Sequence, residues 1–144
     1  ACDPVFVQGD IAYVTLRSGS ECQGFNNQLD VIDVTDLSNP SLMKTYSMTN
    51  PHGLSIAGNT MFLCEGDYGL KVLDISDPMD IDEVKNHDDF KTYDVIALPN
   101  DILLVIGADG FRQYDVSDVN KLELLIFRVT QSFRDFLTFK NRNP

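Results

Sequence analysis

Histidines are the side chains of this sequence best suited to acid–base or ligand chemistry. His52 lies between Pro51 and Gly53, and an imidazole in such a turn can accept or donate a proton near neutral pH. The alternative for His52 is a turn residue that hydrogen-bonds only to the backbone. His87 stands beside two aspartates and is expected on the surface. His52 is therefore the best single candidate for a functional side chain.

Three cysteines could form a disulfide or remain free. A bond between Cys2 and Cys22 would close a loop of about 20 residues and stabilise the chain by roughly 3 kcal/mol in an oxidising compartment. The alternative is three free thiols, with Cys64 as a small core residue in an apolar strand pattern. A metal site is not expected, since no two cysteines are close in the sequence and only the two histidines could join them.

Aspartates recur at a fixed interval, and three equivalent carboxylates invite a calcium or acid–base interpretation. Asp33, Asp74 and Asp115 are separated by 41 residues each time. A catalytic residue has no reason to appear in every unit, so the repetition favours a structural role. The acidic loops lack the ligand spacing of dense oxygen sites, and adventitious Ca²⁺ is the most that they predict. No cofactor is expected, because glycine-rich phosphate loops and Ser/His/Asp sets are absent.

The elements that would position these residues follow the same 41-residue repeat. Gly9-Asp10, Gly58-Asn59 and Asn100-Asp101 interrupt apolar alternations, as in hairpins with two-residue turns that favour positive φ. A third strand ends at the repeated aspartate, and a weaker fourth strand is expected near residues 42–46 and 82–86. Four short strands in a unit of this length are typical of a propeller blade.

The repeat predicts an all-β fold, a partial β-propeller of about three four-stranded blades followed by an atypical tail. Closed propellers have about four to eight blades, and three blades leave two unpaired edges that need a partner or a cover. The aromatic and basic tail could be a strand that completes a sheet, a short helix or an ill-fitting terminus. The expected boundaries are residues 5–48, 49–90 and 91–124 for the blades and 125–144 for the tail.

Charge and hydropathy exclude two classes of partner. The chain carries 22 acidic and 11 basic residues, for a net charge of −11, which argues against nucleic acid because phosphate binding needs a basic surface. No apolar run approaches the roughly 20 residues of a membrane-spanning helix.

The first unit carries an insertion, residues 17–28, and loops of this kind often bind ligands.

Two segments resemble the LVIVD repeat family. They are Leu-Asp-Val-Ile-Asp-Val-Thr-Asp-Leu-Ser-Asn-Pro at residues 29–40 and Gly-Leu-Lys-Val-Leu-Asp-Ile-Ser-Asp-Pro at residues 69–78. The resemblance covers roughly residues 5–120 and implies propeller-like blades in exported or surface-anchored bacterial proteins. The first unit looks most like lipoproteins of undefined role from the Bacteroidetes. The third unit departs from the pattern, with Val119 in place of the turn proline.

Together these observations predict a non-enzymatic binding or scaffolding module at the bacterial outer membrane or cell surface. Its partner would be another protein or the rest of a longer propeller chain, and any lipid anchor would lie outside this sequence. One alternative is a glycan-binding propeller, which requires Tyr13, Phe25, Tyr68 or Tyr93 exposed on one face. Another is an enzyme with a channel-facing site near His52, marked by clustered polar side chains and a perturbed pKa. The candidate binding residues are His52, Phe25, Tyr68, Asp67 and Asp109.

Overall fold

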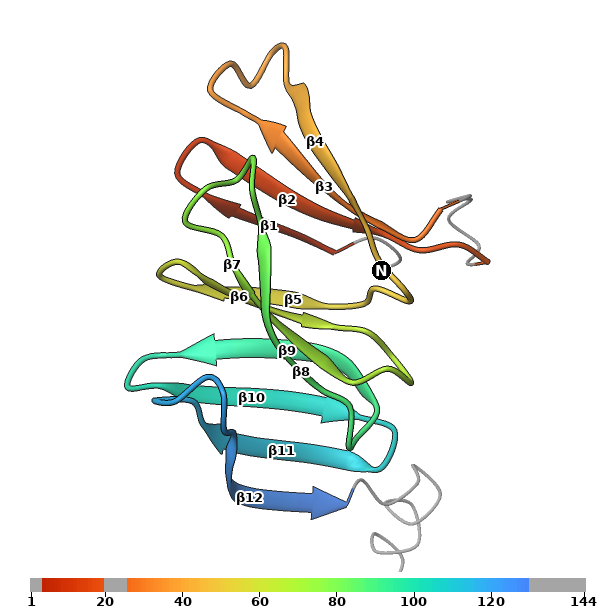
Figure 1. The fold of residues 1–144 in the computed structure, drawn as a ribbon, viewed down its shortest axis with the longest axis vertical. Coiled ribbons are helices and arrows are strands. Elements are labelled where there is room, and N and C mark those ends of the chain that lie inside the picture. Colours follow the sequence, from red (N-terminus) through yellow and green to blue (C-terminus); the bar gives the residue numbers. More distant parts are fainter. Residues whose placement is uncertain (1–3, 20–25, 130–144) are drawn as a thin grey trace, which may run out of the picture.

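The computed structural model describes residues 4–19 and 26–129, which form three four-stranded antiparallel sheets in chain order (Figure 1). Each sheet is a meander in which consecutive strands pair, as expected for a propeller blade. The first sheet contains β1 (Val5–Gln8), β2 (Ile11–Leu16), β3 (Gln28–Asp33) and β4 (Ser41–Ser47). The middle sheet contains β5 (Leu54–Ala57), β6 (Thr60–Cys64), β7 (Leu70–Asp74) and β8 (Asp82–His87), and the third contains β9 (Thr92–Leu98), β10 (Ile102–Gly107), β11 (Gly110–Asp115) and β12 (Glu123–Val129).

Two of the three hairpins have the expected two-residue turns. Gly9 and Gly58 open these turns at φ 59° and 58°, a conformation that costs glycine little. The third hairpin differs from the prediction, because Leu98 pairs with Ile102 and leaves a three-residue loop that includes Pro99. Proline has no backbone N–H with which to extend the ladder. The positive φ values fall on Asn100 (62°) and Asp101 (57°).

The fourth strands lie where the weak patterns indicated, at β4 and β8. In the third sheet β12 pairs with β11 from Glu123 to Val129. The boundary expected after residue 124 therefore falls inside a strand, and residues 125–129 complete the sheet. Residues 130–144 lie outside the described residues.

The core consists of two layers of side chains between the three stacked sheets. One layer joins Tyr13, Leu29 and Val31 of the first sheet to the middle sheet, and the other joins the middle sheet to the third. Strand β6 serves both layers, because successive side chains point to opposite faces. Met61 and Leu63 face the first sheet, whereas Phe62 and Cys64 face the third, and all four are at most 1% exposed.

The repeated aspartates cap turns. Oδ1 of Asp33, Asp74 and Asp115 accepts the backbone N–H of the residue two positions later, at 2.8, 2.9 and 2.8 Å. Hydrogen bonds from the side chain and the backbone N–H of that later residue lower the pKa of each carboxyl group, since they favour its charged form. The aspartates therefore have the structural role that their repetition indicates.

Candidate functional site

The loops of the sheets meet at two opposite ends. The aspartate turns and the hairpins after β1, β5 and β9 lie at one end, which we call the turn end. At the other end, which we call the loop end, backbone hydrogen bonds connect segments of neighbouring sheets. There Thr92 donates its N–H to the Gly66 carbonyl at 3.0 Å, and Gly53 donates to the Tyr93 carbonyl at 3.0 Å. The loop end comprises residues 17–19, 48–53, 65–69, 88–93 and 108–109.

His52 lies at the loop end, on the connection from β4 to β5. Its N–H donates to the Cys64 carbonyl at 2.7 Å, and its carbonyl accepts the Thr15 hydroxyl at 2.9 Å. The backbone of His52 is therefore fixed between the first and middle sheets. The side chain is half-buried, so it is held in place and still reaches the surface.

The His52 ring contacts residues from the two outer sheets. Nη1 of Arg17, which follows β2, lies 2.5 Å from Nδ1 and 2.7 Å from Nε2 of His52. The Tyr93 ring, from β9, lies 5.4 Å from the imidazole between ring centroids, at an interplanar angle of 45°. Three residues that are far apart in the sequence thus form one cluster where the three sheets adjoin.

The surroundings of His52 favour the neutral imidazole. Burial and the Arg17 charge lower its pKa, against the opposing effect of Glu65 and Asp67. The guanidinium can only donate hydrogen bonds, so the imidazole acts as its acceptor. A neutral imidazole could in principle serve as a general base, but its acceptor nitrogen is engaged by Arg17. The arrangement is thus better suited to binding than to proton transfer.

Glu65 is a central residue of this region that the sequence patterns did not single out. It is fully buried, and its carboxylate accepts the Thr49 N–H at 3.1 Å and the Asn50 N–H. Lys71 lies 3.2 Å from the same carboxylate. The buried pair fixes the connection that leads into His52. Its only signal in the sequence is a carboxylate that directly continues the apolar run of β6.

The other predicted residues are divided among different surroundings. Asp67 pairs with Lys91 at 2.8 Å, and both side chains are more than half exposed. Tyr68 is on the same turn as Asp67 and is 53% exposed. Asp109 accepts hydrogen bonds at 2.6 Å from Arg112, which lies on the following strand β11. Phe25, Cys2 and Cys22 lie outside the described residues.

Aromatic exposure separates the tyrosines that the glycan-binding alternative requires on one face. Tyr13 is only 2% exposed and belongs to the core between the first and middle sheets. Tyr93 is 41% exposed and Tyr68 is 53% exposed. A bridge between Gly66 and Thr92 brings their two segments together. Two exposed tyrosines therefore share the loop end, whereas Tyr13 supports the fold.

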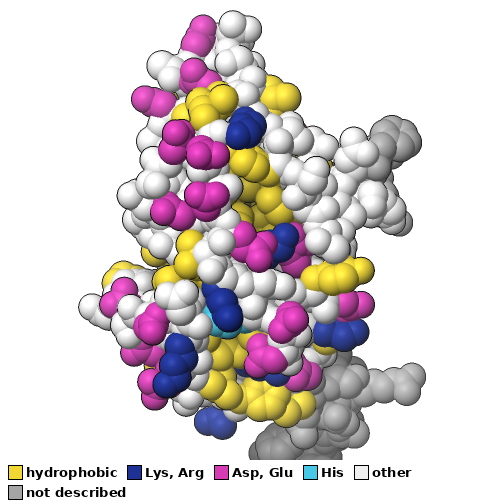
Figure 2. All heavy atoms as spheres, viewed as in Figure 1, with side chains coloured by type: hydrophobic (Ala, Val, Ile, Leu, Met, Phe, Trp, Pro, Cys, Tyr) yellow, Lys and Arg dark blue, Asp and Glu magenta, His cyan; other side chains and the backbone are white. Residues whose placement is uncertain are grey.

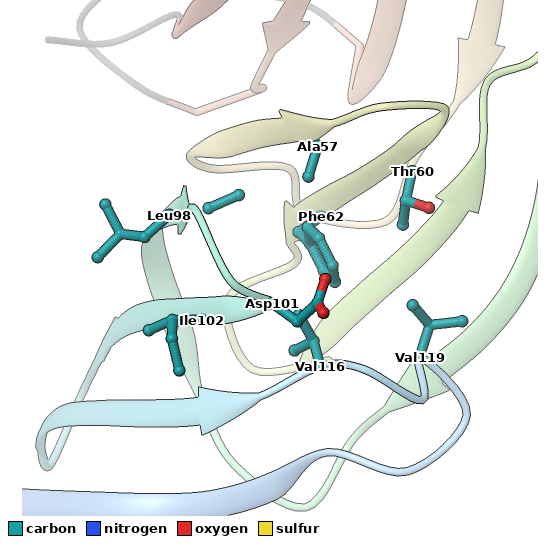
Figure 3. Close-up of a pocket in the computed structure, with 9 residues that line it drawn as sticks. Ala57, Thr60, Phe62, Leu98, Asp101, Ile102, Val116 and Val119 are labelled. Carbon is teal, nitrogen blue, oxygen red and sulfur yellow. The ribbon is translucent and has the colours of Figure 1, made fainter.

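A small pocket opens at the turn end, between the middle and third sheets (Figure 3). Its volume of about 90 Å³ is below the several hundred Å³ usual for small-molecule sites. Figure 3 shows mainly apolar side chains around it, with Thr60 and Asp101 as polar exceptions. It lies away from the His52 cluster, and its chemistry does not extend that site.

Neither a metal site nor a membrane-spanning helix is found in the part of the chain that the structure describes. Within residues 4–19 and 26–129, no group of three or more His, Cys, Asp or Glu side chains is placed to hold a metal ion. The same residues contain no helix with the length and hydropathy needed to cross a membrane.

Comparison with known proteins places the repeat in a family. The LVIVD repeat model matches residues 1–48 and 51–89, which is more than half of the chain and covers the first and middle sheets. No curated protein matches the chain. The repeated strand and aspartate turn, the stacked four-stranded sheets and this match show that the chain belongs to the LVIVD repeat family.

Proposed function

We propose that the chain is a non-enzymatic binding or scaffolding module of an exported or cell-surface protein assembly. The observation that carries this proposal is the apolar character of the two end faces, the outward faces of the first and third sheets. Val5 and Val7 on the first sheet are 59% and 55% exposed, and Ile96 and Ile106 on the third are 53% and 49% exposed.

The repeat shows how unusual this exposure is for these positions. Val7 and Ile56 both stand two residues before the glycine of their hairpin turn, yet Ile56 is only 8% exposed. Ile106 pairs with Phe111 as Cys64 pairs with Leu70, and Cys64 is fully buried. Exposed apolar residues at positions that are buried elsewhere in the repeat mark an interaction surface, which supports a protein partner or further blades of a longer chain.

Charge suits the same proposal. The net charge of −11 keeps an exported surface soluble and discourages non-specific self-association. Figure 2 shows acidic side chains spread over one side of the molecule, with hydrophobic side chains between them. Because like charges repel, we expect stable contacts between proteins to form at the apolar parts of this surface rather than at its acidic parts. The location at an outer membrane or cell surface, and a lipid anchor beyond the sequence, remain parts of the proposal and rest on the family resemblance.

Fractionation of source cells tests the proposal. The protein would be extracted gently, and the mass of its assembly measured by native mass spectrometry. We expect it in the extracytoplasmic fraction, in an assembly larger than one chain, and we expect Ile106→Asp to reduce that assembly. Leu37→Asp is the control, because Leu37 is 85% exposed on a turn and should tolerate the charge. A single unassociated chain in the cytosol would overturn the proposal.

Glycan binding is a second candidate, which the two exposed tyrosines of the loop end favour. Tyr68 follows Asp67 on one turn, and the Tyr93 ring contacts His52. Aromatic rings beside polar groups combine a large apolar surface with hydrogen-bonding partners, as sugar binding requires. A glycan array, followed by calorimetry with any sugar that binds, tests this candidate. Tyr68→Ala and Tyr93→Ala should each weaken binding about tenfold, the equivalent of about 1.4 kcal/mol. Binding unaffected by both substitutions, or none on the array, would remove the loop end as a glycan site.

A further inference from the structure

We infer that a second copy of this chain docks on the end faces, with the third sheet of one copy against the first sheet of the other. Two copies would then close a ring of six sheets. This inference rests on the proposed assembly role and names its partner. It follows from the way in which the repeat distributes side chains between the two faces of each sheet.

The middle sheet defines the two kinds of face. The face toward the first sheet, which we call the leading face, carries Leu54, Ile56, Met61, Leu63, Leu73 and Ile75. The opposite face, the trailing face, carries Phe62, Cys64, Leu70 and Val72. Each interface inside the chain therefore joins the trailing face of one sheet to the leading face of the next.

One end of the chain carries an uncovered leading face. In the first sheet Val5 and Val7 occupy the repeat positions of Leu54 and Ile56, as the spacing to the hairpin glycine shows. Ile32 lies 41 residues before Leu73. The outward face of the first sheet thus has the same apolar positions with which the middle sheet meets its neighbour.

The opposite end carries an uncovered trailing face. In the third sheet Leu104 and Ile106 stand at the positions of Phe62 and Cys64, and Phe111 lies 41 residues after Leu70. Leu104, Ile106 and Phe111 line a shallow depression of about 70 Å³, and Asp94, Val95 and Ile96 complete its lining. The two end faces are therefore the two halves of an interface that the chain already forms twice within itself.

A second copy is the simplest occupant because it brings both missing halves. A contact between unlike faces is heterologous, and it produces either a closed ring or an open filament. Two copies supply six four-stranded sheets, which falls within the range of about four to eight blades in closed propellers. Closure would also cover the apolar residues of both ends in one step.

Sedimentation velocity and light scattering of the purified chain test this inference. We expect a concentration-dependent species of twice the chain mass, and no larger one. Val7→Asp and Ile106→Asp should each raise the dissociation constant at least about tenfold, because each would bury an unpaired carboxylate. Leu37→Asp should leave the dimer unchanged. Circular dichroism and the thermal midpoint of each variant show that the monomer remains folded.

Mixing the two face variants is the sharper measurement. In a heterologous dimer, a Val7→Asp chain retains its third-sheet face and an Ile106→Asp chain retains its first-sheet face. The mixture should therefore associate more strongly than either variant alone, through one intact interface. A contact between two like faces gives no such recovery and would overturn the inference.

The remaining outcomes also decide the question. A monomer at all concentrations, growth into filaments, or a dimer indifferent to both substitutions would each overturn the second copy as the occupant. The proposed assembly role would survive such a result if the protein extracted from cells still carried another partner or further blades on its end faces. It would fail separately if the extracted protein were a single chain.

Discussion

The middle sheet and the two outer sheets are built from the same repeat in different environments. The middle sheet is covered on both faces, and even a charged residue, Glu65, is fully buried at its end. Each outer sheet is covered on one face only, and its other face leaves residues such as Val7 and Ile106 about half exposed. Equivalent side chains thus contribute to the core in one sheet and to an exposed face in another.

This difference explains why the repeat alone says little about the role of any one residue. Hydrophobic burial stabilises by about 25 cal/mol per Å² of apolar surface removed from water. An apolar residue on an end face gains that stabilisation only when a partner covers it. Stability is therefore expected to concentrate in the middle sheet, and association at the ends.

The largest effect is expected at the buried ion pair of the middle sheet. Lys71→Met would leave the fully buried Glu65 without its cation, at a cost of about 3–5 kcal/mol. The matched control is Lys91→Met, which breaks an exposed pair with Asp67 and should lower the free energy of unfolding far less, because water screens that pair. Urea unfolding gives both values. The double variant Glu65→Gln with Lys71→Met should lose less free energy of unfolding than Lys71→Met alone, because no unpaired charge remains buried. Equal losses for Lys71→Met and Lys91→Met would contradict the difference between the buried and the exposed ion pair.

Truncation at one repeat position compares the middle sheet with the first. Ile56→Ala should lower the free energy of unfolding by about 2–5 kcal/mol, because it opens a cavity in the core. At the equivalent position, Val7→Ala should cost less than about 1 kcal/mol in dilute solution, where the end face is in water. Similar losses at the two positions would show that the first sheet is already covered in the isolated chain.

Two glycines test how closely the backbone before β7 approaches the end of β8 within the middle sheet. Gly69 has φ +91°, and a Cβ there would lie 2.0 Å from the His87 carbonyl oxygen. Gly69→Ala should therefore destabilise the chain by about 1–3 kcal/mol more than Gly58→Ala. Gly58 has φ +58° with nothing within 4 Å of a Cβ, so only backbone strain acts there. Thermal unfolding checks the difference, and equal midpoints would refute the close approach at Gly69.

The smallest effect is expected from the titration of His52, which joins the three sheets. Burial and Arg17 lower its pKa below the usual 6.5, so the folded chain binds fewer protons than the unfolded chain between the two pKa values. Stability should therefore be complete above about pH 6.5 and decline as the pH falls through the folded pKa. His52→Gln should flatten this part of the pH profile of urea unfolding. The same slope in both proteins would assign the titration to another group.

The sequence patterns anticipated much of the fold for a physical reason. The hairpin turns, the strand that ends at the repeated aspartate and the weaker fourth strands depend on neighbours in the chain. The prediction was wrong in the third hairpin, where Pro99 lengthened the loop to three residues. It also placed the tail boundary inside β12, because an outer-edge strand with an aromatic, basic pattern carries little of the repeat signature.

The candidate site was anticipated only in part. His52 stood out because of its residue type, and Tyr68 and Asp67 because of their turn. Arg17 and Tyr93 could not be assigned to His52, since they lie 35 and 41 positions away in the sequence and meet it only where sheets adjoin. Tyr13, one of the aromatic residues whose exposure would favour glycan binding, is buried, because its side of β2 faces the middle sheet.

The sequence by itself determined the repeat, the strand pattern and the capping of turns by aspartate, since these depend on periodicity and on hydrogen bonds between neighbouring residues. Only the tertiary structure decided which apolar positions are covered and which polar groups from different sheets meet at His52. Burial depends on what lies across a face, and a chain that repeats the same face three times cannot specify locally which copy has a neighbour.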